Sequence, residues 1–441
     1  MNNFIENKQK EIPPPNLRDL PPARLGGALL GEEEIALAVA TIRSQRLFRY
    51  AYDLPLAGQG PMTSTLEKEV AEASQTRFAL GVTSGTAALE VALAALGIGP
   101  GDEVIVPAWS WISCFTSVVR LGARPVLAEI DDSLCLAPQE IARKKTPRTK
   151  AVMVVHYQGV AADMEPILAE ARKAGLDVIE DCAEAAGASY QGHPVGSMGR
   201  IGILSFQHQK IITSGEGGMV VTSDAGLYER AVRMHDLGSY RAFHTLHHQP
   251  QGTSFCGAQY RMSELTAAVA LGQFRKLSRL RNHCRKLAQP IQEAVREFSQ
   301  CEPRHLPDPE GDLGFETYFF VPSDKQRDEF VKKMGELNVA CTRMTGTYGH
   351  FARDYCKTEP THTPAASPFA LFETWPAPGY REVDFPQTME LSSRMVSIPI
   401  GILHNEADAR YIADAIRHAA LQMGWNRNIP THTQAPFPAS E

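Results

Sequence analysis

Residues 78–96 read FALGVTSGTAALEVALAAL, and this stretch gives the first indication of the fold. The apolar run Phe78–Thr83 predicts a buried strand, and the leucine spacing in Ala87–Leu96 predicts a helix with one apolar face. A strand that leads directly into a helix is typical of α/β proteins. The turn between them, Ser84, Gly85 and Thr86, would place free backbone N–H groups at a helix start, where a phosphate binds well. The same turn also occurs as a purely structural feature.

The alternation of strand and helix continues to about residue 235. Short apolar runs predict strands at Val104–Pro107, Pro125–Ile130, Ala151–His156 and Asp177–Glu180, with helices at about 113–121 and at Met164–Ala174. Asp163 is the predicted N-cap of the second helix. This pattern indicates a large α/β domain whose sheet is mostly parallel and covered by helices on both sides.

A smaller α+β domain is predicted after Met262. Its predicted segments are a helical stretch to about Ser299 that Pro290 interrupts, strands at Thr317–Val321 and Met395–Ile400, and helices at Arg327–Leu337 and Ala407–Met423, the last opened by Asn405. The predicted units are therefore an extended, proline-rich arm (1–25), a large domain (26–260), a small domain (261–425) and a flexible tail (426–441).

The composition is that of an ordinary globular protein, with 441 residues, a net charge of −6 and eight cysteines. Because no global positive charge is present, neither nucleic acid nor an anionic membrane is an expected partner. The cysteines lack the Cys/His spacing of zinc sites, so no metal is expected. Neither a signal peptide nor an apolar run long enough to span a bilayer is visible, and we expect a cytoplasmic protein with reduced thiols.

Three more residues stand at or near the carboxyl ends of predicted strands, where α/β folds bind ligands. A buried Asp181 would need a cationic partner, such as a pyridinium nitrogen. Lys210 lies between two apolar strands, and burial favours the neutral amine that forms imines. Trp111 offers a ring face for stacking. Taken separately, the three fit a polar strand end, a surface lysine and a core tryptophan. Together with the Ser84–Thr86 turn, they match the needs of pyridoxal 5′-phosphate (PLP).

The motifs as a set resemble those of DegT/DnrJ/StrS-type aminotransferases over about residues 25–420. They are Ser84–Leu89, Gly101–Pro107, Val155-His156, Glu180–Ala183, Ser205–Lys210, Gly215–Gly218 and Tyr260–Leu265. The resemblance implies the PLP-dependent transferase fold of type I, with a large domain of mostly parallel sheet and a smaller α+β C-terminal domain. It also implies bound PLP and a homodimer whose active sites are shared between subunits.

The resemblance also implies roles for individual residues. Lys210 would form the imine with PLP, Asp181 would contact the pyridinium nitrogen, and Trp111 would stack on the ring. The phosphate would be bound by Ser84, Gly85, Thr86 and Ser205.

Two predicted cofactor-binding residues depart from the family pattern. Gln259 stands where an asparagine usually reaches the PLP phosphate of the partner subunit. Glu184 stands where a glutamine or histidine usually lies near the phenolic oxygen of the cofactor. A carboxylate at this position would repel a phenolate unless it is protonated or paired.

The activity that the resemblance implies is ping-pong transfer of an amino group from glutamine or glutamate to a keto-cyclitol or keto-sugar, as in antibiotic or other secondary-metabolite pathways. Leu25-Gly26-Gly27, Leu47–Tyr50 and Ser205-Phe206-Gln207 resemble the cyclitol and aminoglycoside branch. The segment 239–256, with its three histidines, is a candidate substrate loop. Two alternatives stay open: dehydration and aromatisation as in aminohydroxybenzoate synthase, and a regulatory homologue that binds PLP without turnover.

Overall fold

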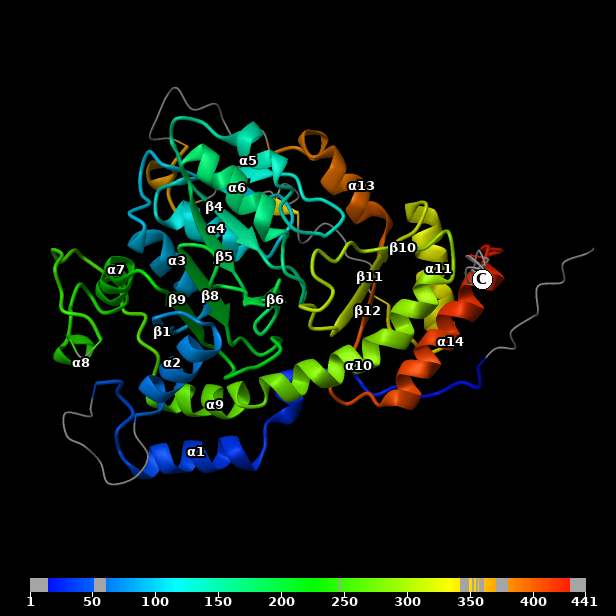
Figure 1. The fold of residues 1–441 in the computed structure, drawn as a ribbon, viewed down its shortest axis with the longest axis horizontal. Helices are drawn as coiled ribbons and strands as arrows, with labels where there is room; N and C mark the ends of the chain where they lie inside the picture. Colours follow the sequence, from blue (N-terminus) through cyan, green and yellow to red (C-terminus); the bar gives the residue numbers. More distant parts are fainter. Residues whose placement is uncertain are drawn as a thin grey trace, which may run out of the picture.

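The computed structural model describes residues 15–50, 61–245, 247–341, 349–350, 353, 356, 361–369 and 380–428. Within these residues, a large body surrounds a seven-stranded sheet and a smaller body surrounds a three-stranded sheet (Figure 1). The large sheet has the strand order β1-β9-β8-β5-β4-β2-β3. Its strands are β1 (Phe78–Val82), β2 (Glu103–Pro107), β3 (Arg124–Ala128), β4 (Thr149–Val155), β5 (Asp177–Asp181), β8 (Ile201–Ser205) and β9 (Gly218–Thr222).

Strand direction decides where the polar strand ends meet. Strands β3, β2, β4, β5 and β8 run parallel to one another. Strand β9 is antiparallel to both β8 and β1. The carboxyl ends of all strands except β9 therefore lie at one edge of the sheet, and β9 begins at that edge. The predicted mostly parallel sheet is confirmed.

Successive residues of each strand alternate between two apolar cores, one on each face of the sheet. In β4, Val152 and Val154 belong to the first core, and Ala151, Met153 and Val155 belong to the second. The first core is covered by helices α2 (Met62–Ala73), α5 (Gln139–Lys144), α6 (Met164–Ala174) and α9 (Glu264–Phe274). The second core is covered by helices α3 (Gly85–Ala95), α4 (Ser113–Arg120) and α7 (Ala225–His235). Both faces of the sheet are thus covered by helices, as the continuous apolar strands predicted.

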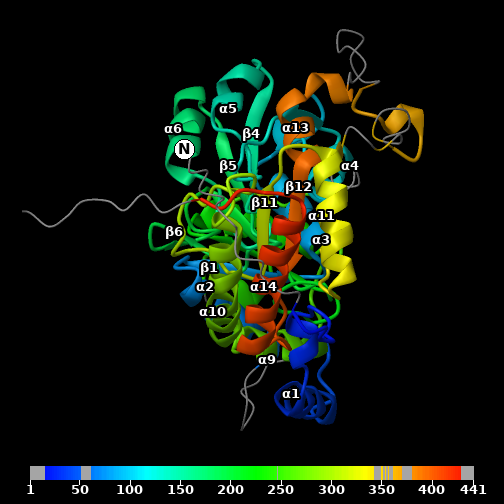
Figure 2. The same cartoon turned by 90° about the vertical axis from the view of Figure 1, so that its right-hand side faces the viewer.

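The smaller body is built on the antiparallel strands β10 (Glu302–Pro303), β11 (Glu316–Phe320) and β12 (Met395–Pro399). Helices α10 (Leu277–Arg296), α11 (Asp324–Glu336) and α14 (Glu406–Gln422) share an apolar core with this sheet, and Figure 2 shows α11 and α14 in front of it. As predicted, Asn405 caps α14, and its side chain accepts hydrogen bonds from two backbone N–H groups. The remaining described elements are η1 (Gly26–Leu29), α1 (Glu32–Arg43), β6 (Ser189–Tyr190), β7 (His193–Pro194), α8 (Ala242–Thr245), η3 (Pro364–Ala366), η4 (Glu382–Asp384) and α13 (Pro386–Arg394).

Two local predictions were wrong. Helix α10 continues through Pro290 rather than breaking there, because Leu287, Ile291 and Ala294 are buried on both sides of the proline. That burial offsets the one backbone hydrogen bond that proline cannot donate. Helix α6 has the predicted bounds, but the Asp163 side chain does not cap it; one carboxylate oxygen instead accepts a hydrogen bond from the Tyr190 hydroxyl at 2.6 Å.

Both ends of the described chain are tied to the smaller body. Arg18 forms an ion pair with Asp408 at 2.7 Å, and the Arg24 carbonyl accepts the Ile402 N–H. At the other end, the Asn428 N–H donates to the Glu297 carbonyl. The arm is therefore extended but held in place as far as it is described, while residues 1–14 and 429–441 lie outside the described residues. The predicted domain boundaries stay predictions, since α9 packs on the large body and α10 continues the chain into the small one. Among the helices that the structure describes, none combines the length and apolar character needed to cross a bilayer.

Gly218 allows β9 to pass close to the start of α3, and this generates a stability prediction. A Cβ atom at residue 218 would lie 2.4 Å from the Ser84 carbonyl oxygen. We expect Gly218→Ala to lower the free energy of unfolding by about 1–3 kcal/mol, because the backbone must shift. The control is Gly335→Ala in α11, where a Cβ meets nothing within 4 Å; it should leave stability unchanged or raise it by up to about 1 kcal/mol. Equal stability of the two variants in denaturant titrations would contradict this account.

Candidate active site

A cavity of about 370 Å³ opens at the edge of the large sheet where the strand carboxyl ends meet. All predicted site residues except Gln259 line it: Ser84, Gly85, Thr86, Trp111, Asp181, Glu184, Ser205 and Lys210. They come from the loops after β1, β2, β5 and β8, which are far apart in the sequence. Parallel strand direction brings them together.

The β1–α3 turn forms one end of the cavity. Ser84 caps α3, since its Oγ accepts the Ala87 N–H at 3.0 Å. Helix geometry leaves the N–H groups of Gly85 and Thr86 without acceptors inside the helix, at the positive end of its dipole. A Cβ at residue 85 would lie 2.8 Å from the Ser205 Cβ, so glycine permits this close approach. The arrangement suits a phosphate group.

The Asp181 carboxylate lies buried at the end of β5 with two hydrogen bonds of its own. One oxygen accepts the Ala183 N–H at 2.9 Å, and the other accepts the Cys114 thiol at 3.1 Å. Burial raises the pKa of the Asp181 carboxyl, while these hydrogen bonds and the charge on Lys210 act to lower it. A cationic ligand atom would favour the ionised form further.

Lys210 lies in the β8–β9 loop and pairs with Glu184, with 3.3 Å between Nζ and Oε1. The Glu184 side chain is only 8% exposed, and its Oε2 has no hydrogen-bond partner among the described residues. The carboxylate that departs from the family pattern is therefore paired with the lysine. Its free oxygen is a buried acceptor at the cavity wall, which a ligand donor would satisfy. The donor set thus fits a group that carries a phosphate, a ring nitrogen and a carbonyl carbon.

Trp111 and Gln259 occupy more exposed positions. Trp111 lines the cavity and is 48% exposed. Gln259 is exposed, does not line the cavity, and pairs through its backbone with Asp236.

Comparison with known proteins identifies the family. The sequence profile of the DegT/DnrJ/EryC1/StrS aminotransferase family matches residues 53–417. The chain belongs to this family. It is accordingly a PLP-dependent aminotransferase of fold type I, and the family implies an amino donor and a keto-sugar acceptor.

Solved structures agree with the assignment over most of the chain. 3-Amino-5-hydroxybenzoic acid (AHBA) synthase is 26% identical, with a TM-score of 0.74 and coverage of 93% of this chain and 100% of that chain. The aminotransferase from Psychrobacter cryohalolentis is 28% identical, with a TM-score of 0.74 and coverage of 90% and 98%. DesV of S. venezuelae is 28% identical, with a TM-score of 0.71 and coverage of 88% and 94%.

Several residues that line the cavity of the aminotransferase were not predicted as site residues. Ser113 lies 2.8 Å from Thr86, oxygen to oxygen, and Cys114 contacts Asp181. Leu25 comes from the N-terminal arm and Phe315 from the residue before β11. A sequence signal existed for Ser113 and Cys114, because they begin the helix after Trp111. Leu25 belongs to the Leu25-Gly26-Gly27 motif, but neither it nor Phe315 carries a local signal for the cavity, which both reach through the packing of distant segments.

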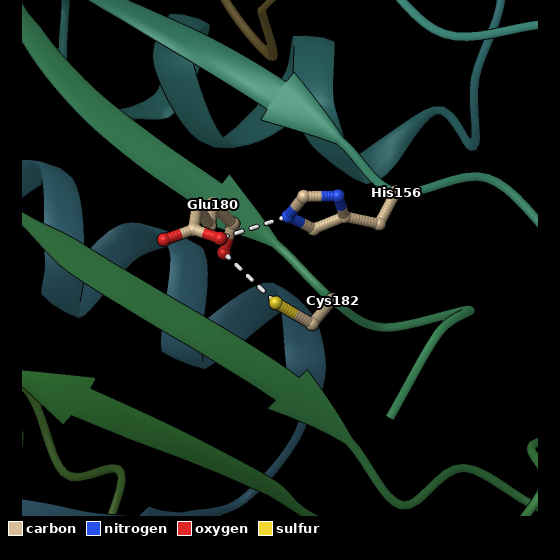
Figure 3. Close-up of side chains that lie close together, drawn as sticks. All are labelled: His156, Glu180 and Cys182. Atoms are coloured by element: carbon tan, nitrogen blue, oxygen red, sulfur yellow. Dashed lines mark hydrogen bonds and ion pairs between the residues drawn. The ribbon is translucent and has the colours of Figure 1, made fainter. Parts of the chain in front are cut away.

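One buried cluster in the aminotransferase has the composition of a metal site, namely His156, Glu180 and Cys182 (Figure 3). The Glu180 carboxylate already accepts hydrogen bonds from the His156 ring at 2.9 Å and from the backbone N–H groups of Gly196, Met198 and Gly199. His156 Nδ1 accepts the Ala162 N–H at 3.1 Å, so Nε2 carries the proton. Burial raises the pKa of the Cys182 thiol well above its usual range. The potential ligand atoms are thus occupied, and the cluster anchors the 196–199 turn beside Asp181.

The candidate substrate loop, residues 239–256, does not reach this cavity with any of its described residues. His244 is buried, and its two ring nitrogens lie 2.8 Å from the hydroxyls of Tyr50 and Tyr228. Burial, followed by the positive charge of Arg49, lowers the pKa of His244. Within one chain, the histidine is therefore a structural residue that holds the loop against Tyr50.

The occupied His156–Glu180–Cys182 cluster predicts that metal does not stabilise the protein. A zinc ion bound at one hundred times its Kd would add about 2.7 kcal/mol to the free energy of unfolding. We expect neither added zinc nor a chelator to change Tm, and we expect elemental analysis to find no stoichiometric metal. Zinc that copurifies and whose removal lowers Tm would overturn this reading.

Proposed function

We propose that Lys210 carries PLP as an imine and that the enzyme transfers an amino group from glutamine or glutamate to a keto-cyclitol or keto-sugar. The observation that carries the proposal is the convergence of Lys210, Asp181 and the Ser84–Thr86 turn on one cavity. When bound, PLP supplies an electrophilic carbonyl carbon and an electron sink for the reaction.

Each lining residue has a role in this proposal. Backbone N–H groups of Gly85 and Thr86, with the hydroxyls of Ser84 and Ser205, hold the phosphate. Asp181 holds the ring nitrogen, and the exposed face of Trp111 holds the ring. Gln259 does not line the cavity of its own chain and is assigned to the phosphate in the partner subunit.

Lys210 performs the proton transfers in the proposed reaction. With PLP bound, the neutral amine of Lys210 would be the base that takes the proton from the donor α-carbon and, as the ammonium, the acid that returns it. Glu184 lies 3.3 Å away and keeps the amine directed into the cavity through their ion pair. A side-chain nitrogen that stays close to the reacting carbon, first as the amine and then as the ammonium, is what this proton transfer requires.

The small number of cationic side chains in the cavity favours an acceptor substrate without charge. Its polar lining beyond the proposed cofactor groups includes the amides Gln158, Gln207 and Gln209. No arginine stands among the described lining residues, and Lys210 is the cation there. Amides hydrogen-bond hydroxyl groups well, whereas a diphosphate needs cationic partners. A keto-cyclitol or free keto-sugar is therefore favoured over a nucleotide-linked sugar.

A homodimer is the assembly that we propose. Helix α1 buries Leu37 against the large body but exposes Ile35, Val39 and Ile42, which share one face at i, i+4 and i+7. We propose that a second copy of the chain covers this apolar face of α1. The role proposed for Gln259 also needs a second subunit nearby.

The half-reaction with an amino donor tests the catalytic proposal. Glutamine or glutamate should convert the bound cofactor to its amine form, with a change in its absorbance. Lys210→Ala should slow this conversion by about 10²–10⁴-fold, because the general acid and base is lost. Lys173→Ala, which changes an exposed lysine on α6, is the matched control.

The second half-reaction, in which the amine form of the cofactor meets a ketone, identifies the class of acceptor. Keto-cyclitols, free keto-sugars and nucleotide-linked keto-sugars are offered to the amine form, and return of the original absorbance identifies the acceptor class. An aromatic product without amino transfer would support the AHBA-synthase-like alternative. Failure of every donor to change the spectrum, or borohydride reduction that labels a peptide without Lys210, would refute the proposal.

The α1 stripe predicts the effect of a charge on assembly. Val39→Asp should convert the dimer to a monomer, since an aspartate buried without a partner costs several kcal/mol. Val383→Asp introduces the same change at a residue that is 74% exposed outside α1 and should leave the dimer intact. Size-exclusion chromatography with light scattering measures both. A dimeric Val39→Asp variant would contradict the assignment of this face.

A further inference from the structure

Two buried cysteines flank the Asp181 carboxylate, and only one of them touches it. Cys114 lies in the first turn of α4, lines the cavity, and places its Sγ 3.1 Å from Asp181 Oδ2. Cys182 follows Asp181 directly, but its Sγ lies 3.7 Å from the Glu180 carbonyl oxygen and it does not line the cavity. A variant of Cys182 can therefore serve as the control for a variant of Cys114.

The Cys114 thiol carries a proton that it can donate. Burial, followed by the nearby charge of Asp181, raises the pKa of Cys114 well above its usual range. A thiol that stays protonated beside a carboxylate oxygen has one role open to it, as hydrogen-bond donor. It is also a poor nucleophile in this state, so the structure does not suggest covalent chemistry for it.

Buried polar side chains surround that donor. His350 Nε2 lies 3.0 Å from Ser110 Oγ, and Ser110 lies close enough to the Cys114 thiol to act on its pKa, which it lowers. Burial lowers the pKa of His350 to about 3, so the ring is neutral. The neutral ring shares a hydrogen bond with the Ser110 hydroxyl, and the Cys114 thiol donates to the Asp181 carboxylate.

Backbone contacts hold His350 in place. Its N–H donates to the Ala108 carbonyl at 3.0 Å, and Gly349 pairs with Trp109 in a β-bridge. The segment after β2 and residues 349–350 are thus held together near α4, since the rings of Phe115 and His350 lie 5.8 Å apart. A rotation of the Cys114 side chain would break its contact with Asp181.

We propose that Cys114 is a positioning residue that holds Asp181 ionised and oriented toward the ring nitrogen of PLP. The proposal rests on the proposed role of Asp181. Three groups lower the pKa of the Asp181 carboxyl: the Ala183 N–H, the Cys114 thiol and the charge on Lys210. The amine of Lys210 changes its bonding when PLP binds, whereas the Cys114 hydrogen bond stays in place.

PLP affinity in Cys114 variants tests the proposal. PLP is titrated into the apoenzyme, and the absorbance of the bound cofactor is followed against pH. Cys114→Ala should weaken PLP binding by about three- to tenfold, the loss of one ordinary hydrogen bond, because a thiol is a weak donor. It should also change the pH dependence of the spectrum, which a packing defect would not do. Cys114→Ser keeps a donor and should retain affinity within about twofold.

Two controls separate positioning from packing. Cys182→Ser alters the other buried thiol and should leave PLP affinity and spectrum as in the wild type. In an Asp181→Asn background, the carboxylate is absent, so Cys114→Ala should have no further effect on PLP affinity. Additive losses in the double variant would overturn the proposal, and so would a Cys114→Ala enzyme with wild-type affinity and pH dependence.

The same titration distinguishes this inference from the proposed function. A wild-type enzyme that binds PLP and reacts with a donor, together with an unaffected Cys114→Ala variant, refutes only the role of Cys114. A wild-type enzyme whose bound PLP does not react with any donor refutes the proposed function instead.

Discussion

Parallel strand direction is the constraint on which the rest of the structure depends. The loops after β1, β2, β5 and β8 leave the sheet at the same edge, so residues separated by more than a hundred positions line one cavity. The segments at that edge also pack very closely. A Cβ atom at Gly85 would clash with Ser205, and a Cβ atom at Gly218 would clash with the Ser84 carbonyl oxygen. The cavity exists because these two glycines let three chain segments approach one another.

Much of this arrangement follows from local patterns in the sequence. Strands buried on both faces are continuous apolar runs, and their predicted limits agree with β1, β2, β4 and β5 to within two residues. Asp181 and Lys210 could be singled out because a charged residue next to an apolar strand is conspicuous. Errors arose where tertiary packing overrides local preference. Pro290 sits in a helix whose neighbours are buried, and Asp163 exchanges a capping role for a hydrogen bond to Tyr190.

The missed part of the site depends on contacts that leave no local trace. Leu25 reaches the cavity because residues 18–24 are held by Asp408 and Ile402, nearly four hundred positions away. His350 meets Ser110 through a β-bridge between segments that no periodicity connects. His244 illustrates a second limit. The histidine-rich loop stays a candidate substrate loop, but the ring of this buried histidine is already satisfied by two tyrosine hydroxyls. Residue type alone cannot separate a ligand from a satisfied core group.

The balance of charge in the cavity explains why these residues require a ligand. Asp181 and Glu184 are two buried carboxyl groups, and Lys210 is the cation that lines the same space. Buried charges are stable only when paired and hydrogen-bonded. Asp181 has two donors, but Glu184 keeps one oxygen without a partner among the described residues. A protonated ring nitrogen would complete the pairing of Asp181, and a donor beside Lys210 would complete that of Glu184. The departure from the family pattern at residue 184 therefore adds to the site an acceptor, Glu184 Oε2, while the other oxygen of the same carboxylate pairs with Lys210.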